Sequence, residues 1–98
     1  MKPATINTVL LRESAASFIW SHSWLKPGEA PTRYLPGSVE LARVMRFADK
    51  DGYRRVCDGD LDRFPNTSCI KAALSSAGFV EGTDYKDGEP TQVLYMGF

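Results

Sequence analysis

The chain has 98 residues, of which 43% are hydrophobic, 11% aromatic and 24% charged. This length allows one compact domain and excludes a two-domain enzyme, and the composition is that of a packed globular protein rather than a disordered one. Twelve basic residues balance twelve acidic ones, so there is no overall positive field to draw the protein onto nucleic acid, and any contact with DNA has to be local.

The N-terminal third favours a strand followed by a helix. Residues that prefer β-structure cluster between positions 5 and 9, although the sequence leaves residues 5–11 open as strand or helix. Ser14 is expected to cap a helix that continues through Trp20. The segment from Lys26 to Gly37 then holds three prolines and two glycines, which excludes a regular helix or central strand. We therefore expect an N-terminal arm with its loop, residues 1–36, separate from a C-terminal unit.

The C-terminal unit, residues 38–98, is expected to begin with a helix capped by Ser38. This helix is expected to stop near Gly52, where a glycine can adopt the left-handed conformation, and a short strand over residues 53–57 follows. The buried side of the helix is marked by apolar residues at three- and four-residue spacing, namely Leu41, Val44, Met45 and Ala48.

Two further helices are expected between residues 58 and 78. Asp58 can cap a short helix that ends before Pro65, because the residue before a proline is pushed out of the helical region. A longer helix is capped by Asn66 or Thr67 and ends at Gly78. Its buried face is expected to consist of Ile70, Ala73, Leu74 and Ala77.

The last part of the chain predicts a two-stranded hairpin. Residues 80–85 and 91–98 have strand character, and the turn-rich residues 86–90 separate them. This hairpin has a net negative charge, because Lys86 is its single basic residue and its acidic residues are Glu81, Asp84, Asp87 and Glu89.

Three stretches of the C-terminal unit together resemble a known family. They are Asp60-Leu61, Asn66-Thr67-Ser68-Cys69-Ile70-Lys71-Ala72-Ala73-Leu74 and Ala77-Gly78-Phe79-Val80. With the expected order of helix, strand, helix, turn, helix and hairpin, residues 38–98 resemble a winged helix-turn-helix domain. The resemblance implies an α+β fold in which a small winged helix-turn-helix domain carries an N-terminal strand and helix arm.

In the winged-helix family, the third helix places its N-terminal polar residues in the major groove of double-stranded DNA. The resemblance therefore implies a small DNA-binding protein that acts as a transcriptional regulator. Because a single neutral module makes too few phosphate contacts for useful affinity at physiological salt, we expect a homodimer, formed through Phe18, Ile19, Trp20 and Trp24 of the arm. The DNA-contacting residues that it implies are Asn66, Thr67, Ser68 and Lys71, with Arg54 and Arg63 as neighbouring phosphate contacts. For each residue the alternative is a local role, as a helix cap or a solvated charge.

The acidic hairpin departs from the family pattern, because it repels phosphate where members of the family usually attract it. A winged helix with an acidic wing is also expected of a protein-binding module, such as a phage- or plasmid-encoded inhibitor that docks on a host nucleic-acid enzyme or defence complex. The partner-binding residues would then be Phe18, Trp20, Trp24, Asp87 and Glu89.

Other functions find little support in the sequence. The two cysteines, Cys57 and Cys69, are too few for a disulfide framework, and His22 is the single histidine, so we expect no metal and no cofactor. Residues 58–62 imitate the start of a calcium loop but lack its later ligands. With no catalytic constellation, we expect no enzymatic activity. No apolar run approaches the roughly 18 to 20 residues of a membrane span, and we expect a cytoplasmic protein without a membrane partner.

Overall fold

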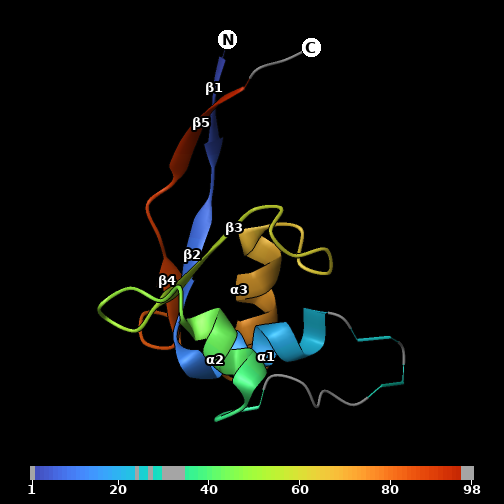
Figure 1. Ribbon diagram of the computed structural model, residues 1–98. Helices are drawn as coiled ribbons and strands as arrows, with labels where there is room; N and C mark the ends of the chain where they lie inside the picture. The colour runs from blue at the N-terminus through green and yellow to red at the C-terminus, as the bar shows by residue number, and fades with distance from the viewer. Residues whose placement is uncertain (1, 24, 27, 30–34, 96–98) are drawn as a thin grey trace.

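The computed structural model describes residues 2–23, 25–26, 28–29 and 35–95. It is a small α+β fold with antiparallel sheets, as expected, although these residues do not form a winged helix in the expected order (Figure 1). In chain order the elements are β1 (Lys2–Ile6), β2 (Thr8–Leu11), α1 (Glu13–Ser23), α2 (Val39–Met45), β3 (Arg54–Cys57), α3 (Thr67–Ser76), β4 (Tyr85–Asp87) and β5 (Thr91–Tyr95).

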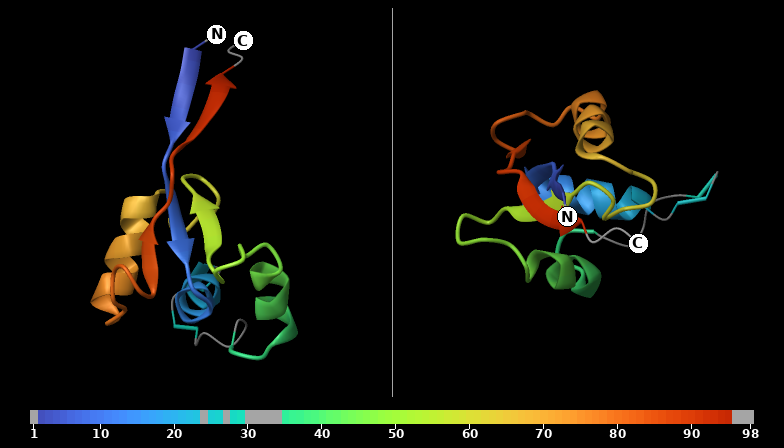
Figure 2. Two further views of the ribbon diagram at one scale, coloured as in Figure 1. Left: turned by 90° about the vertical axis from the view of Figure 1, so that its left-hand side faces the viewer. Right: turned by 90° about the horizontal axis from the view of Figure 1, so that it is seen from above.

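The strands form two antiparallel sheets that share one long axis. β2 is the central strand of a three-stranded sheet with the order β3-β2-β4, and β1 pairs with β5 in a two-stranded ribbon. The ribbon continues β2 and β4 away from the helices, and the described part of the chain begins and ends in it, at Lys2 and Tyr95 (Figures 1 and 2). Its register changes at the junction, because residues 7–8 lie opposite residues 88–90. One extra residue on the C-terminal side makes a β-bulge.

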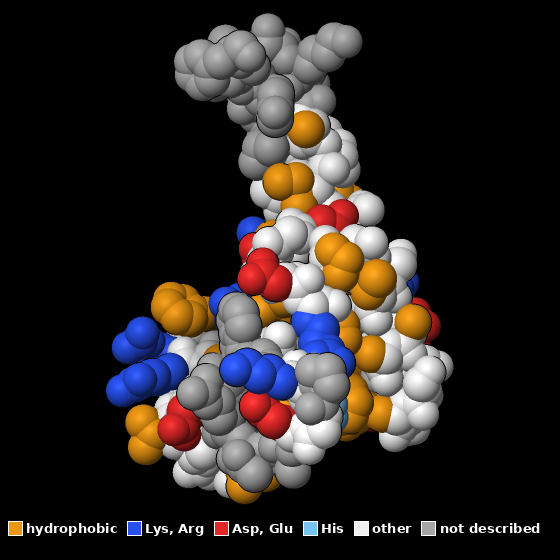
Figure 3. Space-filling view, turned by 90° about the vertical axis from the view of Figure 1, so that its right-hand side faces the viewer, with side chains coloured by type: hydrophobic (Ala, Val, Ile, Leu, Met, Phe, Trp, Pro, Cys, Tyr) orange, Lys and Arg blue, Asp and Glu red, His pale blue; other side chains and the backbone are white. Residues whose placement is uncertain are grey.

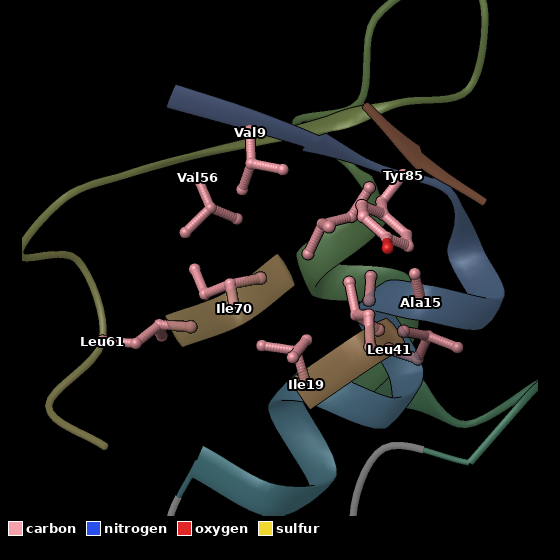
Figure 4. Packing of buried hydrophobic residues seen from close by; sticks show 11 residues of the cluster. Val9, Ala15, Ile19, Leu41, Val56, Leu61, Ile70 and Tyr85 are labelled. Carbon is pink, nitrogen blue, oxygen red and sulfur yellow. The ribbon is translucent and has the colours of Figure 1, made fainter. Parts of the chain in front are cut away.

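The hydrophobic core lies between the three-stranded sheet and the helices. α1 lies between α2 and α3 and contacts both, while α1 and α3 also contact β2 (Figure 2). Every helix contributes to this core, and so do all three strands of the sheet (Figure 4). Its buried residues are Val9, Leu11, Ala15, Ala16, Ile19, Leu41, Val56, Leu61, Ile70, Leu74 and Tyr85.

The expected N-terminal arm does not exist as a separate part. The strand expected over residues 5–9 is confirmed, and residues 5–11 are strand rather than helix except at Asn7. That strand is central, because β2 pairs with β3 on one side and with β4 on the other. α1 begins at Glu13, so Ser14 lies inside the helix and is not its cap. β2 and α1 of the N-terminal segment therefore lie in the middle of the fold, whereas β1 belongs to the ribbon.

The helix after the loop begins where the sequence predicts and ends earlier. Ser38 is its cap, with Oγ accepting a hydrogen bond from the Leu41 N–H at 3.2 Å. α2 ends at Met45 rather than near Gly52. Beyond it, Asp49 accepts hydrogen bonds from two backbone N–H groups of the following loop. Such side-chain bonds compete with helical ones and favour a turn.

The short helix expected after Asp58 is absent, and residues 58–66 form turns and bends. The aspartates of this loop bond to neighbouring backbone instead: Asp60 accepts from the Cys57 N–H, and Asp58 accepts from the Thr67 N–H at 2.7 Å. Leu61 still reaches the core, from a loop. Without this helix, the described residues do not contain the expected pair of helices joined by a tight turn.

α3 confirms the prediction for both of its ends. The Asn66 side chain accepts a hydrogen bond from the Cys69 N–H at 3.0 Å, and Gly78, which follows the C-cap residue Ala77, has a φ of 94°. The Phe79 N–H then bonds to the Leu74 carbonyl at 3.0 Å, which is the bond expected of a glycine-terminated helix. Ile70 and Leu74 are fully buried as expected, Ala73 is half-buried, and Ala77 is exposed.

The predicted C-terminal hairpin is wrong. β4 and β5 do not pair with each other; β4 pairs with β2, and β5 pairs with β1. The residues expected to form the hairpin turn instead contain the bulge, where the Gly88 N–H bonds to the Thr8 carbonyl at 3.1 Å. Residues 81–84 form turns rather than a strand, apart from an isolated bridge at Glu81. The acidic residues assigned to a wing are therefore spread over a turn, β4 and the bulge.

Candidate functional site

The side chains expected to face DNA at the start of α3 are partly used within the fold. Asn66 caps the helix, and Thr67 is buried with its N–H bonded to Asp58. Ser68 is exposed. Asn66 and Thr67 thus have local structural roles, which the sequence left open as the alternative to DNA contact.

Lys71 also has a partner within the fold, because it forms an ion pair with Asp87, a residue that the sequence analysis assigned to a different site. Its Nζ lies 2.8 Å from Asp87 Oδ1, and this hydrogen bond raises the pKa of Lys71. Both side chains line a groove of about 410 Å³ between α3 and the bulge. The other residues that line it are Asn7, Thr8, Thr67, Ser68, Gly88 and Pro90. Because the ammonium and the carboxylate neutralise each other, this groove has little attraction for phosphate.

Arg54 and Arg63, the two arginines expected to contact phosphate beside the start of α3, do not line this groove. Arg63 donates a hydrogen bond to the Leu25 carbonyl, and Arg54 lines a different groove, together with α2. The structure therefore brings Thr67, Ser68 and Lys71 together in one groove, without Arg54 or Arg63.

The aromatic residues expected to bind a partner have different environments. Phe18 is half-buried, with its ring 4.2 Å from that of His22 and 5.5 Å from that of Phe79. Ile19 is fully buried, so it cannot form the expected dimer surface. Trp20 is half-buried and lines the groove beside α2. Trp24 lies outside the described residues.

A second groove, of about 300 Å³, lies between α2, α1 and β3. α2 buries Leu41 in the core and packs Val44 and Met45 partly against it, whereas Glu40 and Arg43 are exposed. The side chains that line the groove are Trp20, Glu40, Arg43, Val44, Arg46, Phe47 and Arg54.

Two guanidinium groups in this groove stack on aromatic rings. Arg46 lies over Phe47 at 5.2 Å from the ring centroid, and Arg54 lies 5.4 Å from Phe47 and 5.7 Å from Trp20. These distances are within the range of cation–π attraction. Arg54 donates to the Arg55 carbonyl, while its Nε is buried and has no hydrogen-bond partner among the described residues. Arg46 is thus held by a ring contact, and Arg54 by two ring contacts together with its bond to the Arg55 carbonyl.

The groove carries unneutralised positive charge. Among the described residues the single ion pair is Lys71–Asp87, so none of the three arginines is ion-paired within the part of the chain that the structure shows. With three arginines against Glu40, the lining has a net charge of two positive units.

Three exposed apolar side chains lie on α2 or close to it in the chain, and one of them, Phe47, lines the groove. Leu35, Val39 and Phe47 have 54%, 66% and 64% of their surface exposed, and each lies on α2 or next to its ends. Figure 3 shows basic and apolar side chains side by side on the part of the molecule that α2 forms. We call these three residues and those lining the groove the α2 surface.

A third hollow, of about 360 Å³, adjoins the α2 surface and shares Phe47 with it. Glu89, one of the expected partner-binding residues, is exposed and lines this hollow. The other lining residues are Leu10, Asp49, Tyr53 and Arg55. Phe47 therefore stands between two concave areas.

The sequence reasoning missed Phe47, Arg43 and Arg46 as functional residues. A signal was present, because Phe47 does not belong to the buried stripe of this segment. A large aromatic residue outside the buried stripe indicates an exposed apolar contact.

Neither a metal site nor a membrane span is found in the described part of the chain. No three histidine, cysteine, aspartate or glutamate side chains lie together there as metal ligands, and none of its helices has the length and apolar character needed to span a bilayer. No family model matches the chain, and no curated protein or solved structure has significant similarity to it.

Proposed function

We propose that this protein is a binding module for another protein and that it docks through the α2 surface. The observation that carries the proposal is the groove lined by arginine and aromatic side chains, with Phe47 64% exposed in it and the exposed Leu35 and Val39 in the adjoining chain. Tryptophan, tyrosine and arginine dominate the binding energy of protein interfaces, usually around a concave, desolvated centre. An inhibitor encoded by a phage or plasmid would act in this way, by covering a working surface of a host enzyme or defence complex.

The composition of the α2 surface favours a protein over nucleic acid. Phe47 and Trp20 could stack on bases, but Leu35 and Val39 are aliphatic and have no such role. Aliphatic side chains at this exposure gain most from an apolar surface on the partner.

The alternative, a regulator that reads double-stranded DNA through α3, has less support. Its expected contacts Asn66 and Thr67 are bonded within the fold, and Lys71 is neutralised by Asp87. A neutral edge of this kind makes too few phosphate contacts for useful affinity at physiological salt.

Photocrosslinking in cells that naturally contain the protein tests the docking surface. A photoreactive phenylalanine analogue is placed at Phe47 and, as the control, at Val80, which is 58% exposed and does not line either hollow beside α2. We expect a protein adduct from position 47 that is absent from position 80. Adducts of equal yield from both positions, or none from position 47, would contradict the proposal.

A second variant checks that the adduct reports docking. With the photoreactive group at Leu35, the further change Phe47→Ala should strongly reduce the adduct, whereas Val80→Ser should leave it unchanged. Circular dichroism of each variant verifies that the fold is intact.

A further inference from the structure

We infer that the segment docking on the α2 surface is acidic, with carboxylates against the arginines and an apolar side chain beside Phe47. The inference rests on the proposed function and specifies the chemistry of the partner. It comes from the balance of charge and apolar area in one groove.

The charge balance excludes a purely apolar partner. Arg43, Arg46 and Arg54 line the groove against Glu40 alone, and none of them is ion-paired within the described residues. Covering these guanidinium groups with apolar side chains would remove their hydration without supplying hydrogen-bond acceptors in return. Carboxylates on the partner replace that hydration with charge-assisted hydrogen bonds.

The ring contacts prepare the arginines for such bonds. Arg46 stacks on Phe47, and Arg54 stacks on both Phe47 and Trp20. Arg46 is exposed, so the planar edge of its guanidinium group can face the two oxygens of a carboxylate, whereas Arg54 already donates to the Arg55 carbonyl and its Nε is buried. Because the rings already restrict these side chains, less conformational entropy is lost when the partner binds.

The apolar part of the segment follows from Phe47 and Val44. Val44 lines the groove floor, half-buried against the core, and Phe47 stands at its edge with 64% of its surface exposed. A leucine or an aromatic side chain between carboxylates would cover both. The expected ligand is therefore a short segment in which acidic residues flank one large apolar residue.

Single-stranded nucleic acid is the competing class of ligand, because phosphates could contact the same arginines while bases stack on Phe47. A nucleic acid ligand would leave the exposed aliphatic side chains Leu35 and Val39 without an apolar partner. The test therefore includes an oligonucleotide as well as peptides.

Fluorescence anisotropy with the full chain measures the preference. The probes are a labelled peptide with one leucine between two pairs of glutamates, the same peptide with lysine for glutamate, the same peptide with serine for leucine, and a single-stranded oligonucleotide of equal charge. We expect the glutamate–leucine peptide to bind most tightly and to weaken as salt increases, since exposed charges are screened.

Charge reversal locates the binding. The double change Arg43→Glu and Arg46→Glu should weaken binding of the acidic peptide at least about tenfold, since removing close interfacial charge pairs has effects of this order. The control, Lys26→Glu with Arg63→Glu, changes the net charge by the same amount at residues outside the groove and should have much less effect. Circular dichroism verifies folding of both variants.

The inference is overturned if the lysine peptide or the oligonucleotide binds as tightly as the acidic peptide, if no acidic peptide binds at low salt, or if both double variants weaken binding equally. Crosslinking at Phe47 separates this failure from that of the proposed function. A protein adduct at Phe47 without preference for the acidic peptide would leave protein docking in place and remove only the acidic partner.

Discussion

Lys71 Nζ lies 2.8 Å from Asp87 Oδ1 and joins α3 to the end of β4. The sequence separated these residues into two functions, one in contact with DNA and the other with a protein partner. In the structure each is the other's counter-ion. The pair therefore explains both charges without an external ligand, and it connects a helix to the strand that adjoins the bulge.

The Lys71–Asp87 pair should contribute little to stability. The two side chains are 30% and 65% exposed, and exposed ion pairs typically contribute about 0.2 to 1 kcal/mol. A double-mutant cycle with Lys71→Ala and Asp87→Ala, measured by urea unfolding, should give a coupling energy in that range that falls when salt is added. A coupling well above it would mean that the pair is more shielded from water than its exposure indicates.

Leu74 should be among the most sensitive positions of the fold. It lies on α3 and is fully buried in the core, so Leu74→Ala removes apolar contacts and leaves a cavity. The expected loss is about 2 to 5 kcal/mol in the free energy of unfolding, measured by urea denaturation. Ser75→Ala, at an exposed position of the same helix, is the matched control and should change stability by much less. Similar melting temperatures for Leu74→Ala and the parent would contradict the core described here.

The parts of the fold that the sequence predicts correctly are those that depend on near neighbours. Asn66 caps α3 through a bond to a residue three positions away, and Ser38 does the same for α2. Gly78 ends α3 through its own backbone conformation. Capping and termination act over a few residues, so a local pattern was enough at these three positions, although the same reasoning failed at Ser14, Gly52 and Asp58.

The pairing of strands could not be predicted in this way. The hydroxyl of Thr8 bonds to the carbonyl of Glu89, 81 positions further along the chain. The choice between a local hairpin and pairing with the distant N-terminal strand depends on the whole core, and Gly88 with its neighbours suits a turn as well as a bulge. The winged-helix resemblance relied on the hairpin and on the helix after Asp58, neither of which forms.

The candidate site was even harder to predict from the sequence, because its residues come from separate segments of the chain. Trp20 lies on α1, Arg43 on α2 and Arg54 on β3. Only the packing of α1 against α2 and the position of β3 bring them into one groove. Nothing local indicated that Trp20 would lie beside the basic residues of the segment that forms α2.

The bulge between the two sheets should not tolerate a side chain at Gly88. An added Cβ would lie 2.5 Å from Thr8 Oγ1 and 3.3 Å from Leu10 Cγ. Since the Thr8 hydroxyl is bonded to the Glu89 carbonyl at 2.8 Å, it cannot move away without losing that bond. We expect Gly88→Ala to destabilise the protein by about 1 to 3 kcal/mol, as overpacking does elsewhere, measured by urea unfolding.

A second variant shows whether the hydroxyl is the cause. Thr8→Ala removes Oγ1 together with its hydrogen bond, so the further change Gly88→Ala should then have a clearly smaller effect than it has in the parent. If the two changes are simply additive, the close approach of Thr8 and Gly88 is not the source of the instability.

Asp49 should make the loop after α2 sensitive to acid. Its Oδ1 accepts hydrogen bonds from the backbone N–H groups of Asp51 and Tyr53 at 2.8 and 3.0 Å. These bonds, the one from Tyr53 first, lower the pKa of Asp49 below its ordinary value of 3.8. A carboxyl whose pKa is lower in the folded state stabilises that state above the unfolded pKa, and the contribution is lost as the pH falls through the folded value.

The measurement is the free energy of unfolding in urea at about pH 7 and about pH 3. Asp49→Asn keeps an amide oxygen that can accept the same bonds without titrating. Its free energy of unfolding should therefore decrease less between the two pH values than that of the parent. Asp62→Asn, at an exposed position, is the control and should follow the parent. Equal decreases in all three proteins would show that the Asp49 turn makes no contribution to acid sensitivity.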